Sequence, residues 1–168
     1  MVAAARISKI ATDRGTWIHD IAEKHFNGED VSEVLRNAPS DVRQMSKDLI
    51  TTVASGVEEI WGQEQVLWSN KLKYAGRTDM VGIWKGKPTI IDFKTSRKLK
   101  KKQWIEDYFM QATFYSMAFF ELTNYPIKDI AILISVNKGE DFQVFHEKVG
   151  NWMKPLHSKI KEYKGIFL

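Results

Sequence analysis

The fold of this chain is decided by the stretch YAGRTDMVGIWKGKPTIIDFK, residues 74–94. Segments rich in Val, Ile and Trp flank Lys85-Gly86, and this pattern predicts two antiparallel strands joined by a two-residue turn. With the turn at this position, counting back along both strands brings Asp79 opposite Asp92. Directly opposed residues have Cβ atoms roughly 5 Å apart, so the two carboxylates are expected to lie close together.

Two carboxylates this close repel each other, and a divalent cation between them removes the repulsion and takes oxygen ligands. Lys94 lies two residues beyond Asp92 and therefore projects from the same face of the strand. The apolar residues around Asp92 predict a largely buried strand, in which two acids and a lysine are costly unless they act together. The alternative is an ordinary salt bridge on an exposed sheet face.

Helical and strand patterns continue on both sides of this hairpin. Helices are expected over about 12–27, 40–62, 104–123 and 150–163, and strands over 64–69, 74–84, 89–94, 129–136 and 142–146. This order predicts the α/β class, with a central mixed β-sheet, an antiparallel meander plus following strands, flanked by helices. We expect one domain over residues 1–168.

Composition excludes several classes of site. The absence of cysteine excludes disulfides, thiolate zinc sites, iron–sulfur clusters and cysteine nucleophiles. No apolar run approaches the ~20 residues that span a bilayer, and residues 1–10 do not form a convincing signal peptide. We therefore expect a soluble, intracellular protein. The net charge of +4 is compatible with a polyanionic partner.

A basic cluster directly follows the strand that carries Asp92. Its members within six residues are Arg97, Lys98, Lys100, Lys101 and Lys102. Such residues would contact a nucleic-acid backbone without reading bases, although a solvated basic loop is the common alternative. Trp104 follows and is expected either to stack on an unpaired base or to pack in the core.

Residues 76–79 (GRTD) and 90–94 (IIDFK) resemble the GxxD and (D/E)xK motifs of PD-(D/E)xK nucleases. The closest similarity is to the RecB-type exonuclease branch, which includes phage and mitochondrial single-strand exonucleases. Residues 15–19 (GTWIH) resemble the Gly-x-x-x-His motif of that branch, and residues 111–115 (QATFY) match its Gln-x-x-x-Tyr motif. The four motifs occur in the family order over residues 12–137, and the resemblance implies a restriction-endonuclease-like fold.

The resemblance also implies roles for single residues. The metal ligands would be Asp79, Asp92, His19 and the carbonyl oxygen of Phe93. Lys94 would orient the attacking water and steady charge on the phosphate, and Glu64 would contact metal-bound water. Gln111 and Tyr115 would touch the DNA strand. The alternatives are an ordinary helical histidine at position 19, Glu58 or Glu59 in place of Glu64, and a core position for Tyr115.

The implied activity is that of a Mg²⁺-dependent DNA exonuclease, with Mn²⁺ as a substitute and without a nucleotide cofactor. It would act on single strands or DNA ends in replication, recombination or repair. The implied location is the cytoplasm of a bacterial or phage-infected cell, with the mitochondrial matrix as the alternative. A structure-specific endonuclease or resolvase, a non-catalytic nucleic-acid-binding module and a scaffolding domain remain alternatives. The missing cysteines exclude cluster-bearing relatives, and the short segment before residue 15 indicates a minimal phage version or a fragment.

Overall fold

The computed structural model describes residues 2–137 and 142–165 of the 168. It divides into two compact units. The first unit comprises Met1–Ser55, Phe93–Leu99 and Leu133–Gln143, and the second comprises Gly56–Asp92, Lys100–Ile132 and Val144–Leu168. Three strands, β3, β4 and β5, contribute residues to both units, and the expectation of a single domain stays a prediction.

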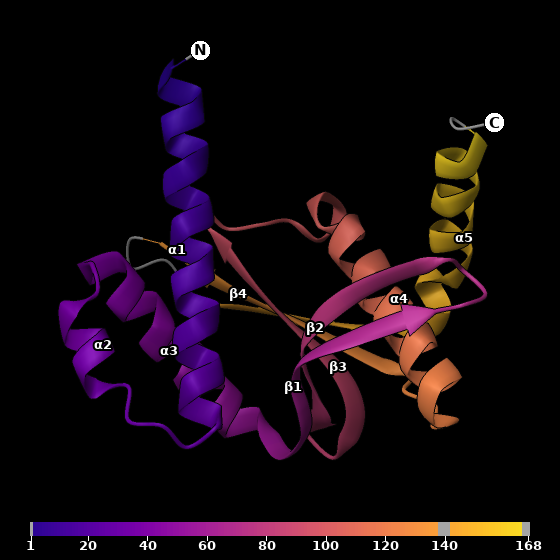
Figure 1. Cartoon of the computed structure of the whole chain (residues 1–168), viewed down its shortest axis with the longest axis horizontal. Helices are drawn as coiled ribbons and strands as arrows, with labels where there is room; N and C mark the ends of the chain where they lie inside the picture. The colour runs from indigo at the N-terminus through magenta and orange to yellow at the C-terminus, as the bar shows by residue number, and fades with distance from the viewer. Residues whose placement is uncertain (1, 138–141, 166–168) are drawn as a thin grey trace. The chain divides into compact units, whose positions relative to one another are not determined.

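Groups of helices and groups of strands follow one another along the described chain (Figure 1). In chain order they are α1 (Val2–Phe26), α2 (Ser32–Asn37), α3 (Ser40–Gly56), β1 (Val57–Ser69), β2 (Tyr74–Trp84), β3 (Lys87–Ser96), η1 (Lys102–Trp104), α4 (Glu106–Thr123), β4 (Asp129–Val136), β5 (Gln143–Lys148) and α5 (Val149–Gly165). No helix within these described residues is long and apolar enough to cross a membrane.

The five strands form one sheet in the order β1-β2-β3-β4-β5. β2 pairs with β1 and with β3 in antiparallel fashion. The amide of Asn137, just after β4, donates to the carbonyl of Ser96 at the end of β3 over 2.9 Å. The carboxyl ends of β3 and β4 therefore lie side by side, so these strands run parallel and the sheet is mixed. The predicted α/β class is confirmed.

The β2–β3 turn has the predicted position. Lys85 and Gly86 have φ values of 47° and 75°, and positive φ at both central residues is the mark of a type I′ turn. Trp84 consequently faces Lys87, as the predicted register requires.

In the first unit, α1 and α3 bury the apolar stripes that their sequences predict. The buried members are Ile18, Ile21, Ala22, Met45, Leu49 and Val53. Arg14 of α1 forms an ion pair with Asp41 of α3 at 3.6 Å. The hydroxyl of Ser135 on β4 donates to the carbonyl of Met45 at 3.1 Å, which ties α3 to that strand.

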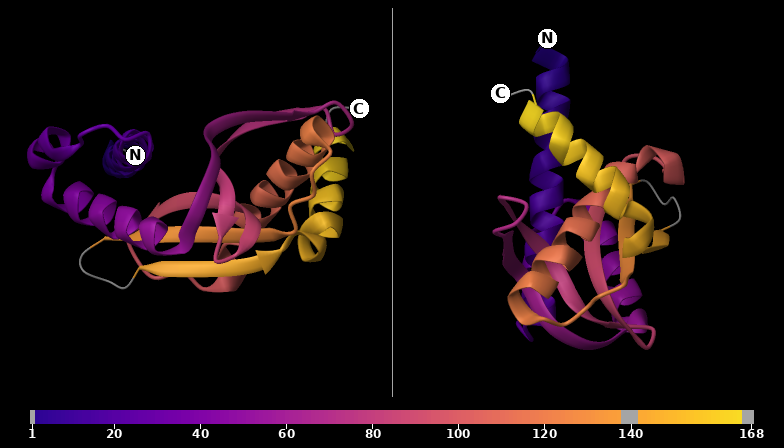
Figure 2. Two further views of the ribbon diagram at one scale, coloured as in Figure 1. Left: turned by 90° about the horizontal axis from the view of Figure 1, so that it is seen from below. Right: turned by 90° about the vertical axis from the view of Figure 1, so that its right-hand side faces the viewer.

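In the second unit, α4 and α5 lie side by side (Figure 2). The ring of Phe109 on α4 stacks on Trp152 of α5 with centroids 5.0 Å apart. The carboxylate of Glu121 on α4 accepts a hydrogen bond from Ser69 at the end of β1 over 2.6 Å. β4 is buried along nearly its whole length, as a continuous apolar run predicts.

Several predicted boundaries were wrong. α1 begins at Val2 because the alanine-rich start of the chain has high helix propensity, and η1 and one further residue precede α4. α2 was not foreseen. α3 ends at Gly56, six residues earlier than expected, and β1 begins there instead of at Glu64. A Cβ on Gly56 would lie 2.5 Å from the ring of Trp84, so the chain turns into the sheet where only glycine fits.

Candidate metal and catalytic site

Three acidic residues lie on three neighbouring strands, β1, β2 and β3. On β1, Glu64 lies between the residues that pair with Met80 and Thr78, so it faces Asp79 on β2. On the other side of β2, Met80 pairs with Ile91 of β3, and this register continued by one residue would place Asp79 opposite Asp92. The charges of both aspartates act on the phenol of Tyr115, which agrees with that placement. We call Glu64, Asp79 and Asp92 the carboxylate row.

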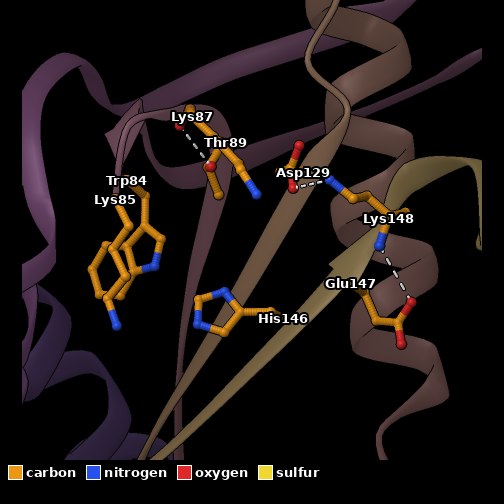
Figure 3. A pocket seen from close by; sticks show the side chains of 8 residues that line it. All are labelled: Trp84, Lys85, Lys87, Thr89, Asp129, His146, Glu147 and Lys148. Atoms are coloured by element: carbon orange, nitrogen blue, oxygen red, sulfur yellow. Dashed lines mark hydrogen bonds and ion pairs between the residues drawn. The ribbon is translucent and has the colours of Figure 1, made fainter.

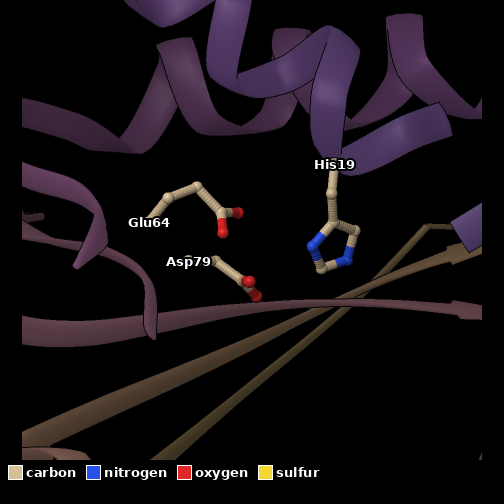
Figure 4. A group of neighbouring side chains, drawn as sticks. All are labelled: His19, Glu64 and Asp79. Atoms are coloured by element: carbon tan, nitrogen blue, oxygen red, sulfur yellow. The ribbon is translucent and has the colours of Figure 1, made fainter. Parts of the chain in front are cut away.

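Glu64 is held in an unusual backbone conformation. Its φ is 47°, a left-handed value that a non-glycine residue adopts only at a cost of order 1–3 kcal/mol. Its carboxylate and that of Asp79 have oxygens within 4.8 Å of one another, and both residues belong to the second unit (Figure 4). The Nε of Arg77 forms an ion pair with Glu64 at 2.7 Å. Arg77 therefore orients this carboxylate, a role that we did not predict from the sequence.

The donor set fits a hard divalent cation. Asp79 is 9% exposed and Asp92 2% exposed, so both carboxylates are withdrawn from water. Neighbouring buried carboxylates repel each other, and Mg²⁺ and Ca²⁺ prefer oxygen ligands of this kind. Glu64 adds a third carboxylate beside Asp79. The alternative of a simple exposed salt bridge at the two aspartates does not agree with their burial.

The first unit places the predicted histidine motif against the continuation of β3. The ring of His19 meets Phe93 edge to face, with centroids 6.0 Å apart. One turn earlier, a Cβ on Gly15 would lie 3.7 Å from the hydroxyl of Thr95. The Gly15 and His19 face of α1 is therefore the face that packs on the strand carrying Phe93 and Lys94. Lys94 is half-buried.

The Gln-x-x-x-Tyr motif on α4 meets the GxxD motif on β2. The Nε2 of Gln111 donates to the hydroxyl of Tyr115 over 3.0 Å. A Cβ on Gly76 would lie 2.9 Å from the Tyr115 ring, so that ring rests on the glycine. Burial, followed by the negative charges of Asp92 and Asp79, raises the pKa of the Tyr115 phenol to about 12. Tyr115 is thus a protonated donor beside the aspartates at neutral pH.

The residues of the basic cluster differ in their contacts and in their exposure. Lys102 forms an ion pair with the buried carboxylate of Glu147. Burial alone would raise the pKa of Glu147, but hydrogen bonds from Lys102 and its other neighbours lower it to about 2. Lys101 lies over the ring of Trp104 at 5.2 Å from the centroid. Trp104 is 60% exposed, so the alternative that it packs in the core was wrong. Arg97 and Lys98 are exposed, and Lys100 is half-buried.

A separate cavity of about 390 Å³ lies at the β2–β3 turn (Figure 3). Burial and the charge of Lys85 lower the pKa of its His146. Its two carboxylates, Asp129 and Glu147, each form an ion pair with a lysine. The acids of this cavity are thus neutralised by lysines, so the carboxylate row is the better candidate for a divalent cation.

Comparisons with known proteins identify the family of this chain. A family model described as the PD-(D/E)XK nuclease superfamily matches residues 3–150. Among solved structures, the chain is similar to a protein from Eubacterium rectale, provisionally named an exonuclease, with a TM-score of 0.58 at 10% identity. That similarity covers 89% of this chain and 64% of the other, so the chain spans less than two thirds of the length of this relative. Likeness at this identity establishes the fold alone.

A second solved structure, that of the protein SSO0001, aligns with a TM-score of 0.43 at 15% identity, covering 88% of this chain and 74% of that one. A TM-score at this level does not establish a shared fold. A search of curated protein sequences finds no significant match.

Proposed function

Because the chain belongs to the PD-(D/E)XK nuclease superfamily, we propose that it is a Mg²⁺-dependent deoxyribonuclease that hydrolyses phosphodiester bonds in single strands or at DNA ends. The observation that carries this proposal is the row of Glu64, Asp79 and Asp92 across β1, β2 and β3. A superfamily of nucleases implies a nucleic-acid substrate. The choice of DNA and of exonuclease action goes beyond the family and rests on the resemblance of residues 15–19 and 111–115 to motifs of the RecB-type exonuclease branch. The choice of single strands rests on the exposed Trp104, whose ring can stack on an unpaired base.

The chain's own residues supply a complete set of oxygen donors. Asp79 and Asp92 would hold the cation, and Glu64, oriented by Arg77, would complete the acidic side of the site. A bound divalent cation supplies Lewis acidity, both to the nucleophile and to the phosphate. The carbonyl of Phe93 follows Asp92 directly and is the fourth proposed oxygen ligand. Mn²⁺ should replace Mg²⁺ because both ions accept octahedral oxygen sites.

His19 is the proposed nitrogen ligand. Its ring already rests on Phe93, the residue after Asp92, and it occupies the histidine position of the family motif. A neutral imidazole is a borderline donor, so a site that includes His19 would favour Mn²⁺ more than a site of carboxylates alone. His25, on the same helix, is exposed and contacts Phe26, which favours His19.

Lys94 would act on the reacting phosphate. It lies two residues beyond Asp92 on the same strand, so its ammonium projects from the face that carries the carboxylates. Three hydrogen-bond donors on one positive charge suit it to orient the attacking water and to steady the negative charge that develops on the phosphate. The expected products carry 5′-phosphate and 3′-hydroxyl ends.

Gln111 and Tyr115 would contact the strand beside the scissile bond. The phenol of Tyr115 is protonated at physiological pH, as a tyrosine of ordinary pKa already is, so it can donate to phosphate oxygens. The exposed residues Arg97, Lys98 and Lys101, with Trp104, would contact the backbone and bases farther away. Lys102 is less suited to this role because it neutralises Glu147. The proposed setting is replication, recombination or repair in a bacterial or phage-infected cell.

The test is degradation of end-labelled single- and double-stranded DNA with Mg²⁺, Mn²⁺ or EDTA. We expect metal-dependent loss of label by the wild type. Asp92→Asn and Lys94→Gln should each lower the rate at least about 100-fold, the usual effect of removing one group that stabilises a transition state. The exposed residues Asp13 and Lys47 offer matched controls, and Asp13→Asn and Lys47→Gln should leave the rate unchanged.

Three outcomes would redirect the proposal. Nicking of a covalently closed circle at a rate similar to that on linear DNA would favour a structure-specific endonuclease on the same carboxylates. Salt-sensitive DNA binding without cleavage in any metal would favour a non-catalytic binding module. Cleavage that survives Asp92→Asn would remove the metal-site assignment itself.

A further inference from the structure

A second cavity of about 520 Å³ lies in the second unit, lined by the β1–β2 turn, α4 and α5. Its size falls in the range of small-molecule sites, about 300–1,000 Å³. Most of its wall is apolar, and five of its lining side chains are aromatic: Tyr74, Tyr108, Phe114, Tyr115 and Tyr163. We call it the aromatic cavity. A cavity of flat rings is suited to flat ligands.

The aromatic cavity shares a wall with the carboxylate site. Tyr115 lines the cavity, its ring rests on Gly76, and the charges of Asp92 and Asp79 act on its phenol. Gln111, which donates to the same phenol, also lines the cavity. Only Tyr115 and Gln111 are needed to connect the cavity with the aspartates, so a ligand in the cavity lies next to a ligand at the aspartates.

Two of the rings offer their surface to solvent. Tyr74 is 62% exposed and Tyr163 is 63% exposed. Tyr74 stands at 89° to the ring of Phe114 with centroids 5.0 Å apart, which fixes its orientation. Lys73, Lys159 and Asp107 also line the cavity, and Lys159 pairs with Asp107 at 3.4 Å. The lining therefore carries one net positive charge beside its rings, which suits a ligand with a flat, uncharged part and an anionic backbone.

We propose that the aromatic cavity binds an unpaired nucleobase of the strand whose phosphodiester lies at Asp79 and Asp92. This inference rests on the proposed nuclease function and specifies its substrate class. Bases inside a duplex are stacked on one another and offer no free face, so a base enters only from a single strand or a frayed end. Tyrosine rings stack on every base, so binding here is independent of sequence.

The experiment measures binding in EDTA, which separates it from cleavage. Fluorescence anisotropy compares a labelled thymidine oligonucleotide with an abasic oligonucleotide of the same length and charge. Moderate salt, about 0.3 M, weakens the contacts to phosphate that both ligands share. The wild type should prefer the thymidine strand roughly 5- to 150-fold, the effect of one stacked base.

Tyr74→Ala and Tyr163→Ala should each reduce this preference, while affinity for the abasic strand stays unchanged. Tyr125→Ala is the matched control, because Tyr125 is 46% exposed and contacts Trp61 outside the cavity. Since both cavity tyrosines are mostly exposed, their removal should leave the unfolding temperature nearly unchanged, which a thermal melt checks. Equal affinity of the wild type for the thymidine and abasic strands would overturn the inference. It would also be overturned if both variants kept the full preference for the thymidine strand, or if Tyr125→Ala lost it.

The two proposals fail separately. A preference for bases without any metal-dependent cleavage would retain the aromatic cavity and remove the nuclease activity. Metal-dependent cleavage without a preference for bases would retain the nuclease and remove the cavity as a base site.

Discussion

Gly82 on β2 is the position where the sheet that carries the site is most sensitive to substitution. A Cβ added there would lie 2.1 Å from the carbonyl oxygen of Glu59 on β1. It would also lie 3.2 Å from the Cα of Ile60. These contacts are with backbone, which cannot rotate away as a side chain can. Gly82→Ala must therefore push β1 away from β2 beside the bulge in their pairing.

The size of the effect follows from two opposing terms. Overpacking of this kind costs about 1–3 kcal/mol, and backbone contact places this case at the upper end. Replacing glycine by alanine also lowers the entropy of the unfolded chain, which raises the free energy of unfolding by about 0.4–1 kcal/mol. The net loss in the free energy of unfolding is about 2 kcal/mol. For a chain of this length that corresponds to a fall of roughly 4–8 °C in Tm.

Urea denaturation followed by circular dichroism measures this loss. The matched control is Gly150→Ala, since a Cβ on Gly150 meets nothing within 4 Å and the residue lies in α5. That change should leave stability unchanged or raise it by up to about 1 kcal/mol. The displaced β1 also carries Glu64, so Gly82→Ala should weaken Mn²⁺ binding measured by calorimetry. If Gly82→Ala unfolds at the same urea concentration as Gly150→Ala, the reasoning about this contact is wrong.

Three further predictions concern the site and its surroundings. Arg77→Gln should weaken Mn²⁺ binding because it releases Glu64, yet it should change the free energy of unfolding by less than about 1 kcal/mol because Arg77 is exposed. Calorimetry measures the first effect and urea melts the second, and an unchanged affinity for Mn²⁺ would show that Arg77 does not position Glu64. In Gly76→Ala the added Cβ would lie 2.9 Å from the ring of Tyr115 and should displace it, which should lower the free energy of unfolding by about 1–2 kcal/mol and slow DNA cleavage. A urea melt and a cleavage assay measure the two effects, and normal activity would show that the ring moves aside without consequence. The pKa of Glu147 is lowered to about 2 from an ordinary 4.5, so its contribution to stability is complete above pH 4.5 and is lost as the pH falls toward 2. Glu147→Gln should therefore remove up to about 3 kcal/mol, less screening by solvent, from the difference in the free energy of unfolding between pH 6 and pH near 2. Urea melts at the two pH values measure this difference, and an equal loss of stability in acid for both proteins would contradict the assignment.

Much of the site could be predicted from local sequence. The β2–β3 hairpin depends on a turn of two residues, and the turn sets the register that aligns Asp79 with Asp92. The helical spacing of Gly15 and His19, and that of Gln111 and Tyr115, likewise fixes which side chains share a face. These features involve neighbours in the chain, so periodicity and turn chemistry determine them.

The choice among the acidic residues of β1 had to wait for the tertiary structure. Glu58, Glu59 and Glu64 are equally acidic in the sequence, and two register shifts between β1 and β2 decide which of them faces Asp79. The end of α3 depended in the same way on the ring of Trp84 packed against Gly56.

Local sequence therefore determined the hairpin with its two aspartates, the motif faces of α1 and α4, and the α/β class. Only the tertiary structure decided that Glu64 faces Asp79, that Arg77 pairs with Glu64, and that Tyr115 lines the aromatic cavity. The physical reason is that turns and helical faces are set by residues a few positions apart. The position of β1 and the walls of the cavity are set instead by packing between segments distant in the sequence, which no local pattern encodes.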